Sequence, residues 1–153
     1  MKLTDILQPD QVVADLNARG KRAVMEELCA PLLAAHPELN SDTLLEVLVE
    51  RERLGSTGIG EGIAIPHGKL SGLSDLLLAL GRSKGGVDFD SLDGKPAHLF
   101  FLVLAPENSA GIHLKALAKI SRMLKSHALR QELMAASDAE EMFQSIAAQD
   151  AEL

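Results

Sequence analysis

Apolar residues recur at helical spacing in the first third of the chain. One stretch has apolar residues four positions apart, which predicts a helix from Lys21 to Ala35. A second helix is predicted from Ser41, a favoured N-cap, to the residues just before Gly55, because glycine commonly ends a helix. Ahead of both, the sequence predicts a helical turn opened by Thr4 and a short strand in QVVADL (11–16).

Short apolar runs in the middle of the chain predict strands: IAIP (63–66), LLLALGR (76–82) and HLFFLVLA (98–105). The third run is apolar on both faces, so helices are expected on both sides of the sheet. SLDGKP (91–96) has the composition of a turn, and these strands are too close together for intervening helices. Part of the sheet is therefore expected to be antiparallel.

The last third of the chain is predicted to be helical. We expect a long helix over 109–125, another from Ser126, and a last one opened by a capping box of Ser137 and Glu140. Residues 1–153 thus predict one α/β domain, with a mixed sheet of about five strands and helices on both faces.

Charge and composition exclude several classes of function. The 153 residues carry a net charge of -7, so no basic surface is expected for nucleic acid or an anionic membrane. No apolar run approaches the length of a membrane span, and the N-terminus lacks a signal peptide, which predicts a cytoplasmic protein. Cys29 stands alone among apolar residues and is expected to be buried.

The segment GSTGIGEGIAIPHG (55–68) is the main candidate for chemistry. Its glycines match neither GxGxxG nor the P-loop pattern, and a strand is predicted after it rather than a helix, so a nucleotide is not expected. The histidines at 36, 67, 98, 113 and 127 show no HExxH spacing. Neither a metal site nor a cofactor is therefore predicted.

His67 stands between Pro66 and Gly68, which would present its ring at a strand end as a nucleophile. The alternative is a histidine that only satisfies hydrogen bonds at a strand end. Arg51 offers a planar cation for phosphate, or else complements the dipole at its helix end. His113 lies near the start of the long helix, where it could donate a hydrogen bond to an anion or act as a cap. These local alternatives remain open.

The segments RERLGSTGIGEGIAIPHGKL (51–70) and HLKALAKIS (113–121) resemble the enzyme IIA proteins of the bacterial phosphotransferase system, in the fructose/mannitol class. The opening MKLTDILQPDQVVADL (1–16) is similar to the nitrogen-regulatory branch of that class. The resemblance implies that His67 accepts a phosphoryl group from an HPr-like phosphocarrier, that His113 hydrogen-bonds it, and that Arg51 stabilises its charge. No Mg²⁺ or nucleotide is implied for this phosphotransferase step.

The nitrogen-regulatory branch implies a phosphoprotein whose phosphorylation state regulates other proteins, such as potassium transport or sensor-kinase systems. One alternative is a free-standing sugar-uptake IIA that passes phosphate to a IIB domain. Another is an interaction module that is never phosphorylated. Ile59 and Ile63 are expected at the edge of the surface where the carrier docks. The sequence decides neither the phosphorylated nitrogen nor the oligomeric state.

Overall fold

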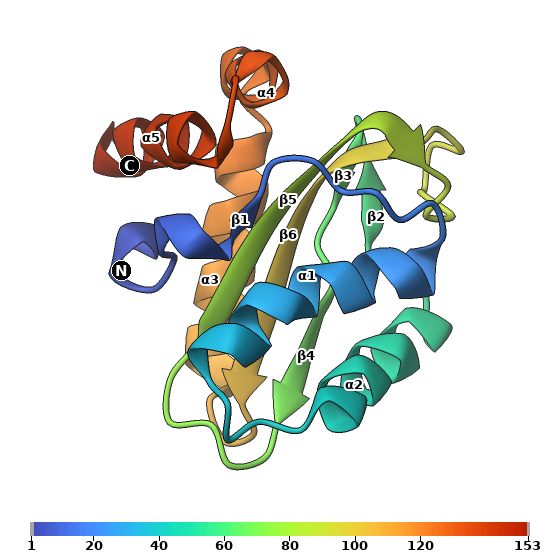
Figure 1. Ribbon diagram of the computed structural model, residues 1–153, viewed down its shortest axis with the longest axis vertical. Helices are drawn as coiled ribbons and strands as arrows, with labels where there is room; N and C mark the ends of the chain where they lie inside the picture. Colours follow the sequence, from blue (N-terminus) through green and yellow to red (C-terminus); the bar gives the residue numbers. More distant parts are fainter. Residues whose placement is uncertain (1, 153) are drawn as a thin grey trace.

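The computed structural model describes residues 2–152, which form a mixed sheet with helices on both faces (Figure 1). The helical elements are η1 (Leu3–Asp5), η2 (Pro9–Gln11), α1 (Lys21–Ala35), α2 (Ser41–Arg53), α3 (Ala110–Leu124), α4 (His127–Ala135) and α5 (Ala139–Glu152). The strands are β1 (Val12–Val13), β2 (Gly58–Gly60), β3 (Ile63–Ala64), β4 (His67–Leu70), β5 (Leu77–Val87) and β6 (Ala97–Pro106). The predicted α/β class is confirmed.

The sheet has the strand order β1-β5-β6-β3-β2, and β4 also pairs with β6. Strands β5 and β6 form an antiparallel hairpin, as the turn composition of 91–96 predicts. Strands β3 and β4 both run parallel to β6, whereas β2 is antiparallel to β3. The sheet has six strands rather than about five, because β2 and β4 lie in the glycine-rich segment and its continuation, which carry little apolar periodicity.

Alternate side chains of β6 face two separate cores. Phe101 and Val103 pack with apolar residues of α3, α4 and α5. Phe100 and Leu102 pack with those of α1 and α2 on the opposite face. Figure 1 shows α1 and α2 on the near side of the sheet and α3 behind it. The strand predicted to be apolar on both faces is therefore the central strand between two helical layers.

The last helix begins one residue later than the sequence predicts. Asp138 Oδ1 accepts a hydrogen bond from Glu141 N at 2.8 Å, and the Glu141 carboxylate accepts one from the Ser137 hydroxyl at 2.5 Å. Asp138 is therefore the N-cap, while the Glu141 carboxylate accepts from Ser137, and the predicted capping box of Ser137 and Glu140 is wrong. Asp138 and Glu141 have the same three-residue spacing as the predicted pair, so the spacing alone does not tell the two starts apart.

A buried ion pair fixes the helix that carries His113. Lys119 Nζ in α3 lies 2.8 Å from Asp150 Oδ1 in α5. The other oxygen of Asp150 accepts a hydrogen bond from Thr4 N at 3.2 Å. Burial alone would raise the pKa of Asp150, but Lys119 and the backbone N–H groups outweigh it and lower that pKa. The N-terminal turn, α3 and α5 are thus joined by charge-assisted contacts.

The prediction that Thr4 opens the N-terminal helical turn is wrong. Thr4 lies inside η1, and the residue at the N-cap position is Lys2.

Candidate functional site

The glycine-rich segment is tied to both α1 and α2 where it leaves the end of α2. Glu52 Oε1 accepts hydrogen bonds from the N–H and the hydroxyl of Thr57, and Glu52 Oε2 lies 2.7 Å from Lys21 Nζ. The Ser56 hydroxyl donates to Phe89 O at 2.7 Å, which attaches the segment to the β5–β6 hairpin as well. The segment therefore has a fixed path before it enters β2.

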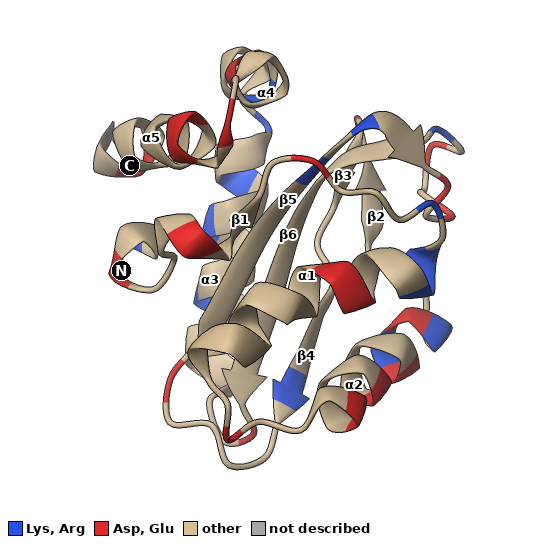
Figure 2. Ribbon diagram, viewed as in Figure 1, with Lys and Arg blue, Asp and Glu red and all other residues tan. Residues whose placement is uncertain are grey.

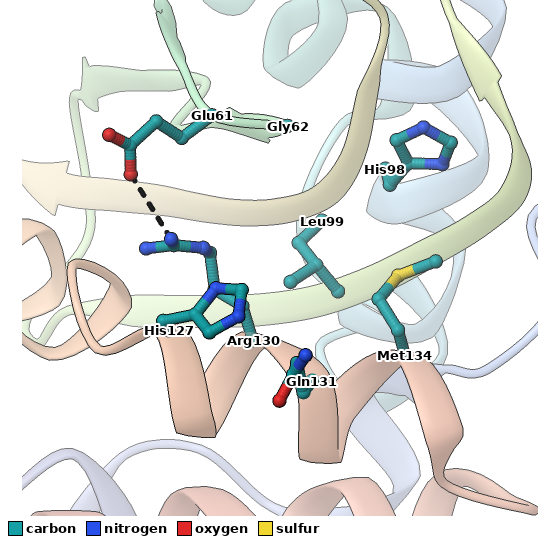
Figure 3. Close-up of a pocket in the computed structure, with 8 residues that line it drawn as sticks. All are labelled: Glu61, Gly62, His98, Leu99, His127, Arg130, Gln131 and Met134. Atoms are coloured by element: carbon teal, nitrogen blue, oxygen red, sulfur yellow. Dashed lines mark ion pairs between the residues drawn. The ribbon is translucent and has the colours of Figure 1, made fainter.

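The turn between β2 and β3 is built around Glu61, which has a φ of 56° and lies between two glycines of positive φ. Glu61 N donates to Asp93 Oδ2 at 2.9 Å, and the Glu61 carboxylate lies 3.2 Å from Arg130 Nη2 in α4. Figure 3 shows this ion pair beside a pocket of about 240 Å³. The turn leads into a strand and offers no helix N-terminus, which a phosphate-binding loop normally uses.

His67 is the first residue of β4, and its ring is oriented by its own backbone. Its Nδ1 lies 2.8 Å from Ile65 O, a carbonyl that can only accept, so Nδ1 carries the proton and Nε2 keeps its lone pair. Within the described residues, β4 pairs only with β6, so the other edge of β4 has no neighbouring strand. His67 thus presents Nε2 from an edge strand.

A close contact between β4 and α2 brings Arg51 towards His67. A Cβ added to Gly68 would lie 2.4 Å from Val47 Cγ1, so only glycine allows this approach. Arg51 follows Val47 by four residues and is therefore on the same side of α2. Arg51 Nη1 donates to Gly55 O at 2.9 Å, beyond the end of the helix. The guanidinium is held at the start of the glycine-rich segment.

His113 reaches the same place from the opposite helical layer. His67 pairs with Val103, whose side chain faces the core that contains α3, so the His67 ring also points towards α3. The centroids of the His67 and His113 rings are 5.4 Å apart, with a tilt of 48°. His113 is 7% exposed, and its Nδ1 is buried without a hydrogen-bond partner among residues 2–152.

The local environment favours neutral imidazoles at both positions. Burial lowers the pKa of His67; the hydrogen bond to Ile65 opposes this effect, and the charge of Arg51 adds to it. Burial also lowers the pKa of His113, with further lowering by His67 and Lys69. Lys69 lies two residues after His67 on β4 and so faces the same side of the strand.

These shifts predict a pH dependence of both titration and stability. His67 and His113 are expected to titrate below the ordinary value of 6.5 in an NMR titration of their ring protons. Since the folded state then binds fewer protons than the unfolded state, the free energy of unfolding should fall as the pH decreases from about 6.5 towards the folded pKa values. Urea unfolding at a series of pH values measures this slope, which should be shallower when both residues are glutamine. A pKa above 6.5 for either ring would contradict the prediction.

The structure thus brings the rings of His67 and His113 together, with Arg51 near enough for its charge to lower the pKa of His67, whereas the remaining histidines lie elsewhere. His98 and His127 line the pocket in Figure 3, and His36 lies at the end of α1. Ile63 is 3% exposed and belongs to the core, so its prediction as a docking residue is wrong: it faces inward from β3. Ile59 is 41% exposed, as a surface residue requires.

Sequence reasoning missed Lys69 and the two exposed apolar residues that flank His113. Ile112 is 52% exposed and Leu114 is 65% exposed. The two-residue period of a strand would have placed Lys69 beside His67. The helical phase of the buried residues His113, Ala116 and Ile120 would have placed both neighbours of His113 outside the core.

Two further negative findings apply to the described part of the chain. Within residues 2–152, no group of three or more His, Cys, Asp and Glu side chains is arranged to hold a metal ion. Across the same residues, no helix has both the length and the apolar character needed to cross a membrane. Figure 2 shows basic residues in the first turn of α1, acidic residues in its middle, and residues of both signs in the last turns of α2.

The sequence matches known proteins over nearly its whole length. The family model described as "Phosphoenolpyruvate-dependent sugar phosphotransferase system, EIIA 2" matches residues 5–149. A nitrogen regulatory protein of Bradyrhizobium diazoefficiens is 38% identical over 147 residues, covering 96% of this chain and 95% of that protein. The fructose-specific EIIABC component of Bacillus subtilis is 39% identical over 136 residues, covering 89% of this chain but 21% of that protein.

Solved structures show the same relationship. The crystal structure of nitrogen regulatory protein IIA-Ntr from Neisseria meningitidis superposes with a TM-score of 0.87 at 36% identity, covering 94% of this chain and 98% of that one. The crystal structure of IIA mannitol from Escherichia coli gives a TM-score of 0.76 at 18% identity, covering 92% of this chain and 99% of that one. The second likeness extends to the fold alone.

Proposed function

Because the chain belongs to the EIIA 2 family of the phosphoenolpyruvate-dependent sugar phosphotransferase system, we propose that His67 is its phosphoryl acceptor. The donor in this proposal is the phosphohistidine of an HPr-like carrier protein. The hydrogen bond of 2.8 Å from His67 Nδ1 to Ile65 O carries the assignment, because it fixes the tautomer and leaves Nε2 free to attack. We therefore propose Nε2 as the phosphorylated nitrogen.

The proposed phosphoryl transfer needs no separate general acid or general base. The Nε2 lone pair of His67 forms a bond to phosphorus while the bond between phosphorus and the carrier imidazole breaks, leaving its electron pair on the carrier nitrogen. Each ring keeps the proton on its other nitrogen, so no proton has to move. The ring of His67 becomes cationic, and Ile65 O, which already accepts from Nδ1 at 2.8 Å, stabilises that charge.

Three other side chains support the phosphoryl group in this proposal. Arg51 supplies a permanent charge from the end of α2, and Lys69 adds charge from the same face of β4 as His67. The Nδ1 of His113 is buried without a partner among the described residues, so the proton is better placed on Nε2, where it can be donated to a phosphoryl oxygen. The protein contributes alignment and charge.

The surface around the site fits a protein donor. Ile112 and Leu114 are 52% and 65% exposed on either side of His113, and Ile59 is 41% exposed on β2. Apolar residues around a central polar group are typical of the core of a protein interface. We propose that these three side chains contact the carrier when its phosphohistidine approaches the open edge of β4.

We further propose that the chain acts as a regulator, as one EIIA domain over residues 1–153 in the cytoplasm. The match of 95% of the length of the Bradyrhizobium nitrogen regulatory protein supports this assignment over sugar uptake. In the proposal, the phosphorylation state of His67 alters binding to other proteins, such as potassium transport or sensor-kinase systems. A free-standing sugar-uptake IIA would instead pass the group to a IIB domain.

A reconstituted relay tests the function. With phosphoenolpyruvate, an enzyme I-type kinase and an HPr-like carrier, the protein should gain one phosphoryl group by intact mass, lost in acid and kept in alkali, and none when the carrier is omitted. No gain with donors that label another IIA protein would refute the carrier role. Retention of the group after sugar-linked IIB domains are added is expected for the regulator; rapid loss would favour sugar uptake.

A further inference from the structure

A cleft of about 750 Å³ lies beside the first turn of α3 and is separate from His67, Arg51 and His113, none of which lines it. The cleft is lined by segments that are distant in the sequence. They are η1, η2, His36 after α1, the segment that enters β5, and the start of α3. The apolar part of the lining includes Leu76, Leu77 and Pro106. The volume is in the range of sites for small molecules.

The side chain of Gln11 supplies a hydrogen-bond donor to this cleft. Gln11 is 5% exposed and lines the cleft, and its Oε1 accepts from Gln8 N at 3.0 Å. That bond fixes the orientation of the amide, so the NH₂ group is directed away from Gln8. Among residues 2–152 this NH₂ group has no hydrogen-bond partner. The amide nitrogen of Gln11 thus lines the cleft as a donor that has no acceptor among the described residues.

The charged groups at the rim favour a cation. Asp5 and Asp75 both line the cleft, and within the described chain neither carboxylate takes part in an ion pair or a hydrogen bond. No lysine or arginine lines the cleft. His36 also lines it, and the Nδ1 of that ring is 3.6 Å from Glu38. An anionic ligand would meet two carboxylates here, whereas an ammonium group would be stabilised.

We propose that this cleft binds a small molecule that carries an ammonium group and a hydrogen-bond acceptor, such as an amino alcohol. Asp5 and Asp75 bind the ammonium group, and the NH₂ group of Gln11 donates to the acceptor. The short carbon chain of the ligand packs on Leu76 and Leu77. All three parts of this recognition come from residues outside the phosphoryl site.

The position of the cleft gives its ligand access to the helix that carries His113. Asn108, the N-cap Ser109 and Ile112 line the cleft, and Ile112 directly precedes His113 in α3. A ligand in contact with this turn changes the position or mobility of His113 and so the rate of phosphoryl transfer. The proposed effect on phosphoryl transfer rests on the proposed function of the protein, whereas the proposed binding of the ligand does not.

Binding is tested on the unphosphorylated protein with 1,3-diaminopropan-2-ol as the probe. Saturable shifts are expected in the amide NMR signals of residues 5, 11, 75 and 108–112. Glycerol, which has the same carbon chain without the amines, should cause none, and 1,3-diaminopropane should bind about 3-fold more weakly because it lacks the hydroxyl. An absence of saturable shifts by the probe, or equal shifts by glycerol, would overturn the site.

Variants identify the groups that bind the probe. Asp5→Asn and Asp75→Asn should each weaken binding about 5-fold or more, since each removes one charge without changing the side-chain volume. Asp10→Asn is the matched control, because Asp10 is an exposed carboxylate of η2 that does not line the cleft. Equal binding by the double variant Asp5→Asn, Asp75→Asn and the wild type would refute the assignment.

The effect of the ligand on phosphoryl transfer is tested in a separate experiment. The probe should change the initial rate of phosphoryl acceptance by the wild type, and Asp75→Asn should require a higher probe concentration for the same change. Binding with an unchanged rate would refute regulation and leave the site intact. If the probe binds but the protein accepts no phosphoryl group from the relay, the proposed function and its regulation are both refuted. The binding site itself would still be supported.

Discussion

Replacement of His67 by glutamine is expected to abolish phosphoryl acceptance. Glutamine has similar polarity but no ring nitrogen that can form a bond to phosphorus, so initial labelling should fall by at least about 1,000-fold. The variant also loses the hydrogen bond from Nδ1 to Ile65 O, which costs about 1 kcal/mol of stability and leaves the protein folded. Intact mass after incubation with the complete relay measures the loss, and circular dichroism checks the fold.

His127→Gln is the matched control, because His127 is an exposed histidine of α4 that lies in the pocket of Figure 3, away from the site. It should be labelled like the wild type. Full labelling of His67→Gln would place the acceptor on another residue. His113 would then be the first alternative, given the 5.4 Å between the two ring centroids, and the double variant would identify it.

The elements with regular apolar spacing are those that the sequence predicts well. The helices at 21–35 and 109–125 and the strand at 98–105 each bury a repeating set of side chains, and each appears within a few residues of its expected bounds. Strands β2 and β4 are different. They exist because Gly60, Gly62 and Gly68 permit turns and a close approach to Val47, contacts that leave no periodic pattern in the sequence.

The sequence identifies the candidate residues of the site, but it does not predict how they are arranged in space. Arg51, His67 and His113 stand in three separate segments, and their meeting depends on the pairing of His67 with Val103 and on the packing of α3 against that face. No local spacing encodes this register. The hydrogen bond to Ile65 O also lies beyond sequence reasoning, since it depends on the backbone path through Pro66.

Arg51→Ala is expected to slow phosphoryl acceptance by about 100-fold to 1,000-fold while leaving His67 as the acceptor. In the proposed function the guanidinium supplies fixed positive charge where the transferred group carries negative charge, and removal of one such group typically has an effect of this size. Arg51→Lys should recover only part of the rate, because lysine keeps the charge but not the planar fork that also donates to Gly55 O. Single-turnover labelling with a purified phosphorylated carrier measures the rates.

Arg53→Ala provides the control that separates a local effect from a general one. Arg53 lies in the same last turn of α2, is exposed, and pairs with Glu50 instead of approaching His67. Both variants change the net charge of the protein equally, so slower docking of a charged carrier would affect both and would depend on salt. A defect confined to Arg51→Ala that persists at high salt would locate the charge at the phosphoryl group. Equal defects in the two variants would instead assign the effect to docking.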